Sequence, residues 1–335
     1  MDLSYRKNWP QIKPVFGEKD YCYLGGESKI KRKILQSNSR WRDFMPIYEL
    51  QRNRKGDVFG CVSFADNNID EFLHKRKYGS EININDRVVV VGSGTKPNIG
   101  NNPTAVSEWK RKNGIVLGEE KWPYTKDMTV TEYYNNYVVP AHLLKEGKEN
   151  LKVYSHGYEW VDYAFFKGAK TTSSENIIKG MQYSPIEASV HGLYEYDDNG
   201  YVKWTGKGYT HEIAIFDYDD YGFWVFDSEA ETIVKFRRDY PFGWPLIKYF
   251  EKKTIKTSPY ILKGNALSVL GKGGRAKGKY RTYADGEDYK FFCGDNYPSH
   301  PDVEVVTEDP ENMDKEYIIS RIKKQFYLDN IDKIL

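Results

Sequence analysis

The chain has few cysteines and no long hydrophobic run. Its 335 residues include three cysteines, Cys22, Cys61 and Cys293, which are odd in number and widely spread. That pattern excludes a disulfide scaffold and is typical of a reducing compartment. No apolar stretch approaches the length of about 18 residues needed to span a bilayer, and residues 1–6 lack the apolar core of a secretory signal. We therefore expect a cytoplasmic protein.

The sequence also lacks an excess of charge of either sign. Lysine and arginine number 50 against 48 acidic residues, which gives a net charge of +2. Bulk charge therefore does not call for a nucleic-acid partner. The histidines are scattered without the spacing of a zinc site, and the glycine-rich residues 271–278 lack the strand–loop–helix context of a phosphate-binding loop. The sequence thus predicts no metal and no cofactor.

Aromatic residues make up 16% of the chain, including 28 tyrosines, which favours β-rich structure. Residues 211–227 have the pattern of a β-hairpin, because apolar residues alternate before a polar turn at 217–220 and are continuous after it. A regular hairpin centred on residue 219 would place His211 opposite Asp227, with Cβ atoms roughly 5 Å apart. A histidine beside a carboxylate is the orienting half of a nucleophilic catalytic site.

Cys61 is the candidate nucleophile. Gly56 and Gly60 predict a turn before it, and a helix is predicted after it from an apolar stripe made of Val62, Ala65, Ile69, Phe72 and Leu73. At the first turn of a helix the unpaired N–H groups favour a thiolate, and a neighbouring imidazolium would lower the thiol pKa further. Cys61 therefore combines with His211 and Asp227 into a predicted catalytic triad.

Further landmarks run in a consistent order along the chain. They are Trp41–Asp43, Gln51, Gly60–Ala65, residues 100–103, 105–109, 113–116 and 122–124, and Ser184–Val190. This order, with a histidine about 150 residues after the cysteine, resembles the papain-like cysteine peptidases over residues 40–250. Heavy use of Lys, Asn, Ile and Tyr is consistent with a divergent bacterial or phage member of that family.

The resemblance implies an α+β fold with two lobes. Residues 40–250 would form the catalytic domain, with a helical lobe at 40–128 and an antiparallel β lobe at 130–250. Strands are expected near 151–154, 159–166, 186–195, 201–205, 211–217, 223–227 and 232–237. Residues 1–39 would be an N-terminal arm. Residues 251–335 would be a C-terminal extension with a terminal helix, able to dock a protein partner.

The resemblance also implies the roles of the site residues. Cys61 would attack a peptide bond and form a thioester, assisted by His211 and Asp227, as in a cysteine endopeptidase. Gln51 would contribute to the oxyanion hole, and the substrate would bind against Gly100, Asn101, Asn102 and Pro185. The expected partner is a peptide or protein substrate.

The sequence departs from the family pattern at several positions. Val62 stands where a tryptophan usually follows the nucleophile, Asp227 replaces an asparagine, and Lys55 rather than a glutamine lies six residues before Cys61. Glu229 replaces the tryptophan that shields the third triad residue, so Trp224 is the candidate for that shield.

Three alternatives stay open. One is another cysteine hydrolase, such as a cell-wall amidase. The second is a phage or virion structural or assembly protein on a papain-like scaffold with a weak or inactive site. The third is a nucleic-acid-binding module at residues 252–281.

Overall fold

The computed structural model describes residues 11, 33–230 and 232–252, together with the strand backbones at 262–263, 279–285 and 288–292. The chain divides into two compact units, Met1–Lys253 and Thr254–Leu335. Cys22, Cys293, most of the predicted N-terminal arm and the predicted terminal helix lie outside the described residues. Within the described part, no helix has the length and apolar character needed to cross a membrane.

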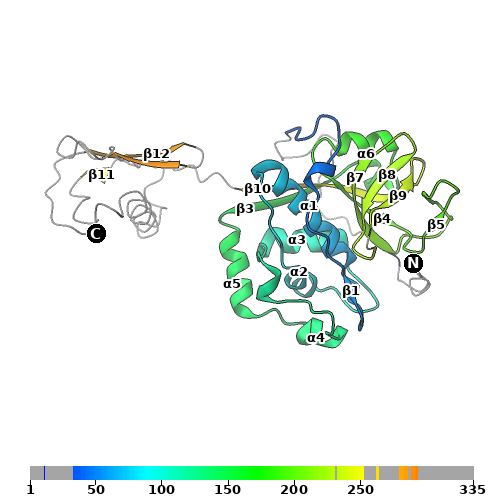
Figure 1. Cartoon of the computed structure of the whole chain (residues 1–335), viewed down its shortest axis with the longest axis horizontal. Helices are drawn as coiled ribbons and strands as arrows, with labels where there is room; N and C mark the ends of the chain where they lie inside the picture. Colours follow the sequence, from blue (N-terminus) through cyan, green and yellow to red (C-terminus); the bar gives the residue numbers. More distant parts are fainter. Residues whose placement is uncertain are drawn as a thin grey trace. The chain divides into compact units, whose positions relative to one another are not determined.

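An eight-stranded mixed sheet forms the centre of the first unit (Figure 1). Its strands, in sheet order, are β3 (Tyr154–Trp160), β10 (Gly243–Lys252), β4 (Ile186–Val190), β7 (His211–Tyr218), β8 (Gly222–Phe226), β9 (Val234–Arg237), β6 (Val202–Lys203) and β5 (Glu195–Tyr196). Neighbouring strands are antiparallel except β6 and β9, which are parallel. The second unit contributes a three-stranded antiparallel sheet of β11 (Leu262–Lys263), β12 (Lys279–Asp285) and β13 (Asp288–Phe292).

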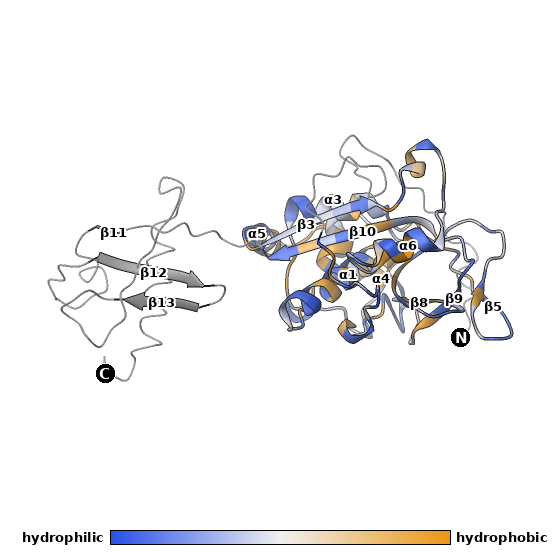
Figure 2. Cartoon of the chain, turned by 90° about the horizontal axis from the view of Figure 1, so that it is seen from above, coloured by the Kyte–Doolittle hydropathy of each residue, from blue (hydrophilic) through white to orange (hydrophobic). Residues whose placement is uncertain are grey.

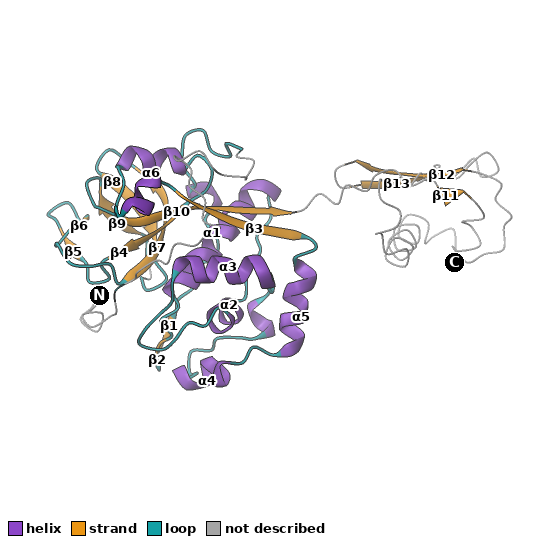
Figure 3. Cartoon of the chain, turned by 180° about the vertical axis from the view of Figure 1, so that it is seen from behind, coloured by secondary structure: helices purple, strands orange, loops and turns teal. Residues whose placement is uncertain are grey.

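Helices cover this sheet unevenly. They are α1 (Cys61–Tyr78), α2 (Asp86–Gly92), α3 (Pro103–Asn113), α4 (Val130–Tyr134), α5 (Ala141–Asn150) and α6 (Ser174–Gly180), with short 3-10 turns η2 (Arg42–Phe44), η3 (Glu119–Lys121), η4 (Asn135–Tyr137) and η5 (Tyr163–Lys167). Figure 3 shows α2, α3, α4 and α5 gathered on one side, with α6 apart from them. Figure 2 shows hydrophobic and hydrophilic residues mixed along these helices.

Helix α1 connects two hydrophobic cores. Ile69 and Phe72 belong to the core beneath the sheet, where Phe72 stacks on Phe216 with ring centroids 5.6 Å apart. Phe64 faces a second core that also contains Val88 from α2. The predicted helix after Cys61 is confirmed, and its apolar stripe is the reason why the helix start is held rigidly against the sheet.

The strand predictions were wrong in the region before β4. Helices α4 and α5 lie within residues 130–150, inside the segment assigned to a β lobe. Of the strand expected near 151–154, residues 151–153 are a turn and Tyr154 begins β3. Residues 163–167 form a 3-10 turn instead of a strand. The ten-residue strand β10 was missed, because Pro245, Lys248 and Glu251 interrupt its apolar pattern. Long-range pairing to β3 and β4 stabilises it.

Candidate functional site

The first strand of the hairpin holds a buried histidine–carboxylate pair. His211 is the first residue of β7, paired in register with Val190 of β4. Its Nε2 lies 2.6 Å from Oδ1 of Asp227, and both side chains are fully buried. With Nε2 engaged by Asp227, Nδ1 is the ring nitrogen that can serve a nucleophile. The structure therefore brings His211 and Asp227 together.

The hairpin geometry differs from the regular hairpin centred on residue 219. Tyr218 pairs with Phe223 and Ala214 with Phe226, with a register shift between Ile215 and Asp217. The Asp219 carboxylate accepts the N–H groups of Tyr221 and Gly222, each at 2.9 Å, which fixes a later turn. Asp227 thus lies past the end of β8 and reaches His211 through its side chain rather than as a direct cross-strand neighbour.

Two tyrosines hold Asp227 in place. The Tyr194 hydroxyl donates to Oδ2 at 2.5 Å, and the Tyr48 hydroxyl donates to the Asp227 carbonyl at 2.9 Å. The Glu229 N–H donates to Oδ1 at 2.9 Å. Sequence reasoning missed both tyrosines, because they lie far from Asp227 along the chain among 28 tyrosines. The carboxylate is oriented before any reaction begins.

Trp224 does not shield Asp227. Its indole N–H donates to Asp219 Oδ2 at 2.8 Å, and the Arg42 guanidinium lies 3.8 Å from its ring centroid. Trp224 lies three residues before Asp227 and closer to the turn, where it pairs in register with Asp217. The aromatic groups beside Asp227 are Tyr48 and Tyr194 instead.

Cys61 begins α1, and its side chain is largely buried, with the residue only 7% exposed. Burial raises the pKa of the Cys61 thiol well above its ordinary value, and the charges of Glu212, Asp57 and Glu229 raise it further, whereas the nearby backbone of Glu212, the residue after His211, lowers it. Burial therefore opposes the thiolate that the helix start was expected to favour.

Gln51 is fully buried and links the two sides of the site. Its Nε2 donates to Asp57 Oδ1 at 2.9 Å, and its Oε1 accepts the Ser228 hydroxyl at 2.7 Å. The extra residues between Gln51 and Cys61 form a small hairpin of β1 (Arg52–Asn53) and β2 (Gly56–Asp57). That hairpin brings the chain back to Gln51. Gln51, ten positions before Cys61, therefore lies beside Ser228, the residue after Asp227.

The predicted substrate loop lies close to the segment before Cys61. A Cβ added at Gly100 would be 3.7 Å from the Phe59 carbonyl oxygen. Phe59 has a φ of 56°, a left-handed conformation that is strained for a bulky residue and that often accompanies functional sites. The Gly100 N–H, however, donates to the Lys96 carbonyl at 2.9 Å.

The two asparagines of this loop serve its own structure. The Asn101 amide donates to the Ser93 hydroxyl at 2.9 Å and to the Thr95 hydroxyl at 3.0 Å. Asn102 is the N-cap of α3, where its Oδ1 accepts the Thr104 N–H at 2.9 Å. These contacts fix the conformation of the loop.

Pro185 is not brought to the site. It is buried directly before β4, whose first residue, Ile186, pairs with Ile215. His211 pairs with Val190 at the opposite end of β4, about 16 Å away at the usual rise of a strand. Pro185 therefore lies at the end of β4 that is far from His211.

A network of buried charges lies behind Cys61 in α1. Lys110 of α3 contacts Asp66 Oδ1 at 2.5 Å and Asp70 Oδ2 at 2.6 Å, both on α1. Lys248 of β10 contacts Asp66 Oδ2 at 2.5 Å and also pairs with Glu187. The two lysines hold the pKa of Asp66 below its usual range. The network fixes α1 to α3 and to the sheet.

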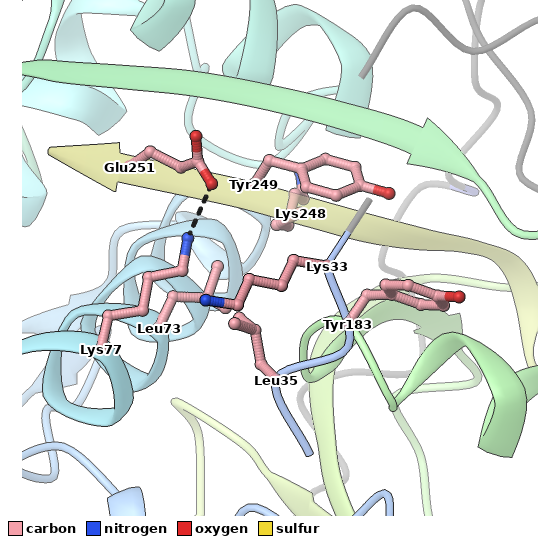
Figure 4. A pocket seen from close by; sticks show the side chains of 8 residues that line it. All are labelled: Lys33, Leu35, Leu73, Lys77, Tyr183, Lys248, Tyr249 and Glu251. Carbon is pink, nitrogen blue, oxygen red and sulfur yellow. Dashed lines mark hydrogen bonds and ion pairs between the residues drawn. The ribbon is translucent and has the colours of Figure 1, made fainter. Parts of the chain in front are cut away.

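Figure 4 shows a small pocket where α1 meets β10. Lys77 and Glu251 pair across it with Nζ and Oε1 3.2 Å apart. A second, more open groove is lined by Leu50, Arg52, Asn53, Arg54, Tyr124, Thr125 and Lys126. No residue of the predicted triad lines either one, although the second groove lies next to Gln51 in sequence.

Comparison with known proteins gives similarity at the level of solved structures only. No family profile matches the chain, and no curated protein matches it. The bromelain protease from Ananas comosus, solved with the E64 inhibitor, is 15% identical with a TM-score of 0.45, over 64% of this chain and 98% of that one. The proform of the ragweed cysteine protease Amb a 11 is 15% identical with a TM-score of 0.45, over 68% and 69%. Procathepsin L 3 of Tenebrio molitor is 12% identical with a TM-score of 0.43, over 72% and 77%. At these identities and TM-scores the similarity assigns no activity.

Proposed function

We propose that this protein is a papain-like cysteine endopeptidase that uses Cys61, His211 and Asp227. One observation carries the proposal: the 2.6 Å contact between His211 and Asp227 lies at the start of a strand whose next residue, Glu212, acts on the pKa of the Cys61 thiol at the start of α1. In this proposal the thiol on α1, the imidazole on β7 and the carboxylate after β8 act together. Such an ordered set of groups supports acyl transfer to a sulfur nucleophile.

The raised pKa of Cys61 favours a general-base mechanism over a preformed ion pair. In this mechanism His211 Nδ1 takes the thiol proton while sulfur attacks the carbonyl carbon of the peptide. The tetrahedral species then collapses to a thioester, and the imidazolium gives its proton to the departing amine. Water, deprotonated by His211, hydrolyses the thioester and regenerates the thiol.

Asp227 and the proposed oxyanion donors support this chemistry. Asp227 stabilises the imidazolium through Nε2, and its two tyrosine partners keep the carboxylate aligned. The Cys61 backbone N–H and the second amide hydrogen of Gln51 are the proposed oxyanion donors, each contributing about 3 kcal/mol if it is aimed at the developing charge.

In this proposal the helices and the sheet form two lobes, and residues 251–335 are an appended docking element.

The test is peptide hydrolysis by the full chain and its Cys61→Ala variant, with Cys293→Ala as the matched control. Cys61→Ala should lower kcat/KM on fluorogenic peptides by at least about a thousandfold. Its melting temperature should stay within a few degrees, and the control should keep full activity. Equal activity of Cys61→Ala and the control would refute the proposal.

A second candidate is a non-catalytic assembly protein on the same scaffold, such as a virion component. The observation that favours it is the burial of Cys61 among Glu212, Asp57 and Glu229, which opposes ionisation of the thiol. This candidate expects no turnover of any peptide in a diverse library, together with slow alkylation of Cys61 in the native protein. Turnover that depends on Cys61 would exclude it.

A further inference from the structure

Three carboxylates from distant parts of the chain meet near α2. Glu49 precedes β1, Asp86 is the first residue of α2, and Glu119 is the first residue of η3. One oxygen from each lies within 4.8 Å of the others. Asp86 is 4% exposed, and the other two are partly buried. Figure 1 shows α2 surrounded by α1, α3 and α4 in this region.

Each carboxylate is anchored through one of its oxygens. Asn83 Nδ2 donates to Glu49 Oε1 at 2.7 Å, and Asn67 Nδ2 donates to Asp86 Oδ1 at 2.7 Å. The Asp86 N–H donates to Glu119 Oε1 at 2.5 Å. These bonds fix the three groups in place, with one oxygen of each close to the other two.

No lysine or arginine among residues 33–230 and 232–252 forms a direct ion pair with Glu49, Asp86 or Glu119. The nearby Arg87, whose charge acts on Glu119, donates its hydrogen bonds to the carbonyls of Pro123, Glu132 and Tyr133. Asp66 and Asp70, by contrast, share Lys110 as a direct partner.

Two buried polar atoms point independently to a ligand. The Tyr133 side chain is fully buried, and its hydroxyl has no hydrogen-bond partner among the described residues. It lies in the field of Asp86 and Glu119, whose charges raise the pKa of Tyr133. Asn67 is 1% exposed, and its Oδ1 likewise has no partner in the described part of the chain. Leaving these two oxygens unsatisfied would cost free energy.

We propose that Glu49, Asp86 and Glu119 bind a divalent cation, with Ca²⁺ as the favoured ion. All donors in the cluster are oxygens, which suits a hard cation, and no cysteine or histidine is present to select zinc. Ca²⁺ accepts irregular oxygen geometry more readily than Mg²⁺ does. The ion would join the segment before Gln51 to α2 and η3. This inference does not depend on the proposed peptidase activity.

The test uses the metal-stripped full chain and three variants of it. Calorimetric titration with CaCl₂ should give one site, and bound Tb³⁺ should luminesce when the aromatic residues of the chain are excited. Saturating Ca²⁺ should raise the melting temperature by roughly 5–10 °C. Glu119→Gln and Asp86→Asn should abolish both responses. Glu120→Gln, which removes an exposed neighbouring charge, should keep them.

Folding of the variants is not a confounding factor in this design. Glu119→Gln removes one charge from a repulsive cluster, so without Ca²⁺ it should melt at or above the temperature of the unmodified chain. The inference is overturned if the unmodified chain shows neither Ca²⁺ stabilisation nor Tb³⁺ luminescence. It is also overturned if Glu120→Gln loses the responses as completely as Glu119→Gln does, since binding would then be diffuse attraction of ions.

Discussion

Replacement of Lys110 by methionine tests the buried network that holds α1 in place. The Lys110 side chain is 1% exposed and contacts Asp66 and Asp70 at 2.5 and 2.6 Å. Methionine has nearly the same length, so the change removes the charge with little change in volume. Two buried carboxylates then lose a cation, which typically costs about 3–5 kcal/mol. At roughly 2–4 °C per kcal/mol for a domain of this size, the melting temperature should fall by roughly 6–20 °C.

Lys112→Met is the matched control on the same turn of α3. Lys112 is 63% exposed and lies 3.6 Å from Glu108, so its loss should cost less than about 1 kcal/mol. Both variants remove one charge from the same helix end, so any helix-dipole effect is shared. Thermal and urea denaturation of the full chain would measure the difference.

The pH dependence provides a second readout. In the unmodified chain the lysines depress the pKa of Asp66, so its contribution to stability is present above its unfolded value and is lost only as pH falls through the lower folded value. Without Lys110, Asp66 takes up a proton at a higher pH. The buried carboxyl group then carries no unpaired negative charge. The loss of unfolding free energy caused by Lys110→Met should therefore be smaller at pH 4 than at pH 7. An equal effect of Lys110→Met and Lys112→Met at pH 7 would refute this reasoning.

Two further predictions concern the triad. Because burial and Glu212 raise the pKa of Cys61, its alkylation by iodoacetamide should still accelerate above pH 9; mass spectrometry that shows a plateau below pH 7 would contradict this. Tyr194→Phe removes the 2.5 Å bond to Asp227 and should lower kcat about tenfold with KM unchanged and the pH profile shifted. Tyr201→Phe removes a comparable tyrosine–carboxylate hydrogen bond at Asp219 and should leave kcat, KM and the pH profile unaltered.

Local patterns in the chain were enough to predict the elements that carry the triad. The apolar stripe after Gly60 predicts α1, because its period near 3.6 is that of a helix. Apolar residues that alternate before a polar turn and are continuous after it predict β7 and β8. The proximity of His211 and Asp227 follows from that hairpin, even though the turn itself lies later than a regular register would place it.

Features that depend on contacts between distant segments had no such signal. Strand β10 exists because β3 and β4 pair with it, despite a proline and charges in its sequence. Tyr48 and Tyr194 meet Asp227, and Glu49 meets Asp86 and Glu119, only after the chain folds. The protonation of Cys61 likewise depends on how deeply the thiol is buried and on which carboxylates surround it. Short-range periodicity encodes helices and strands, whereas desolvation and Coulomb interactions depend on neighbours that are remote in the chain.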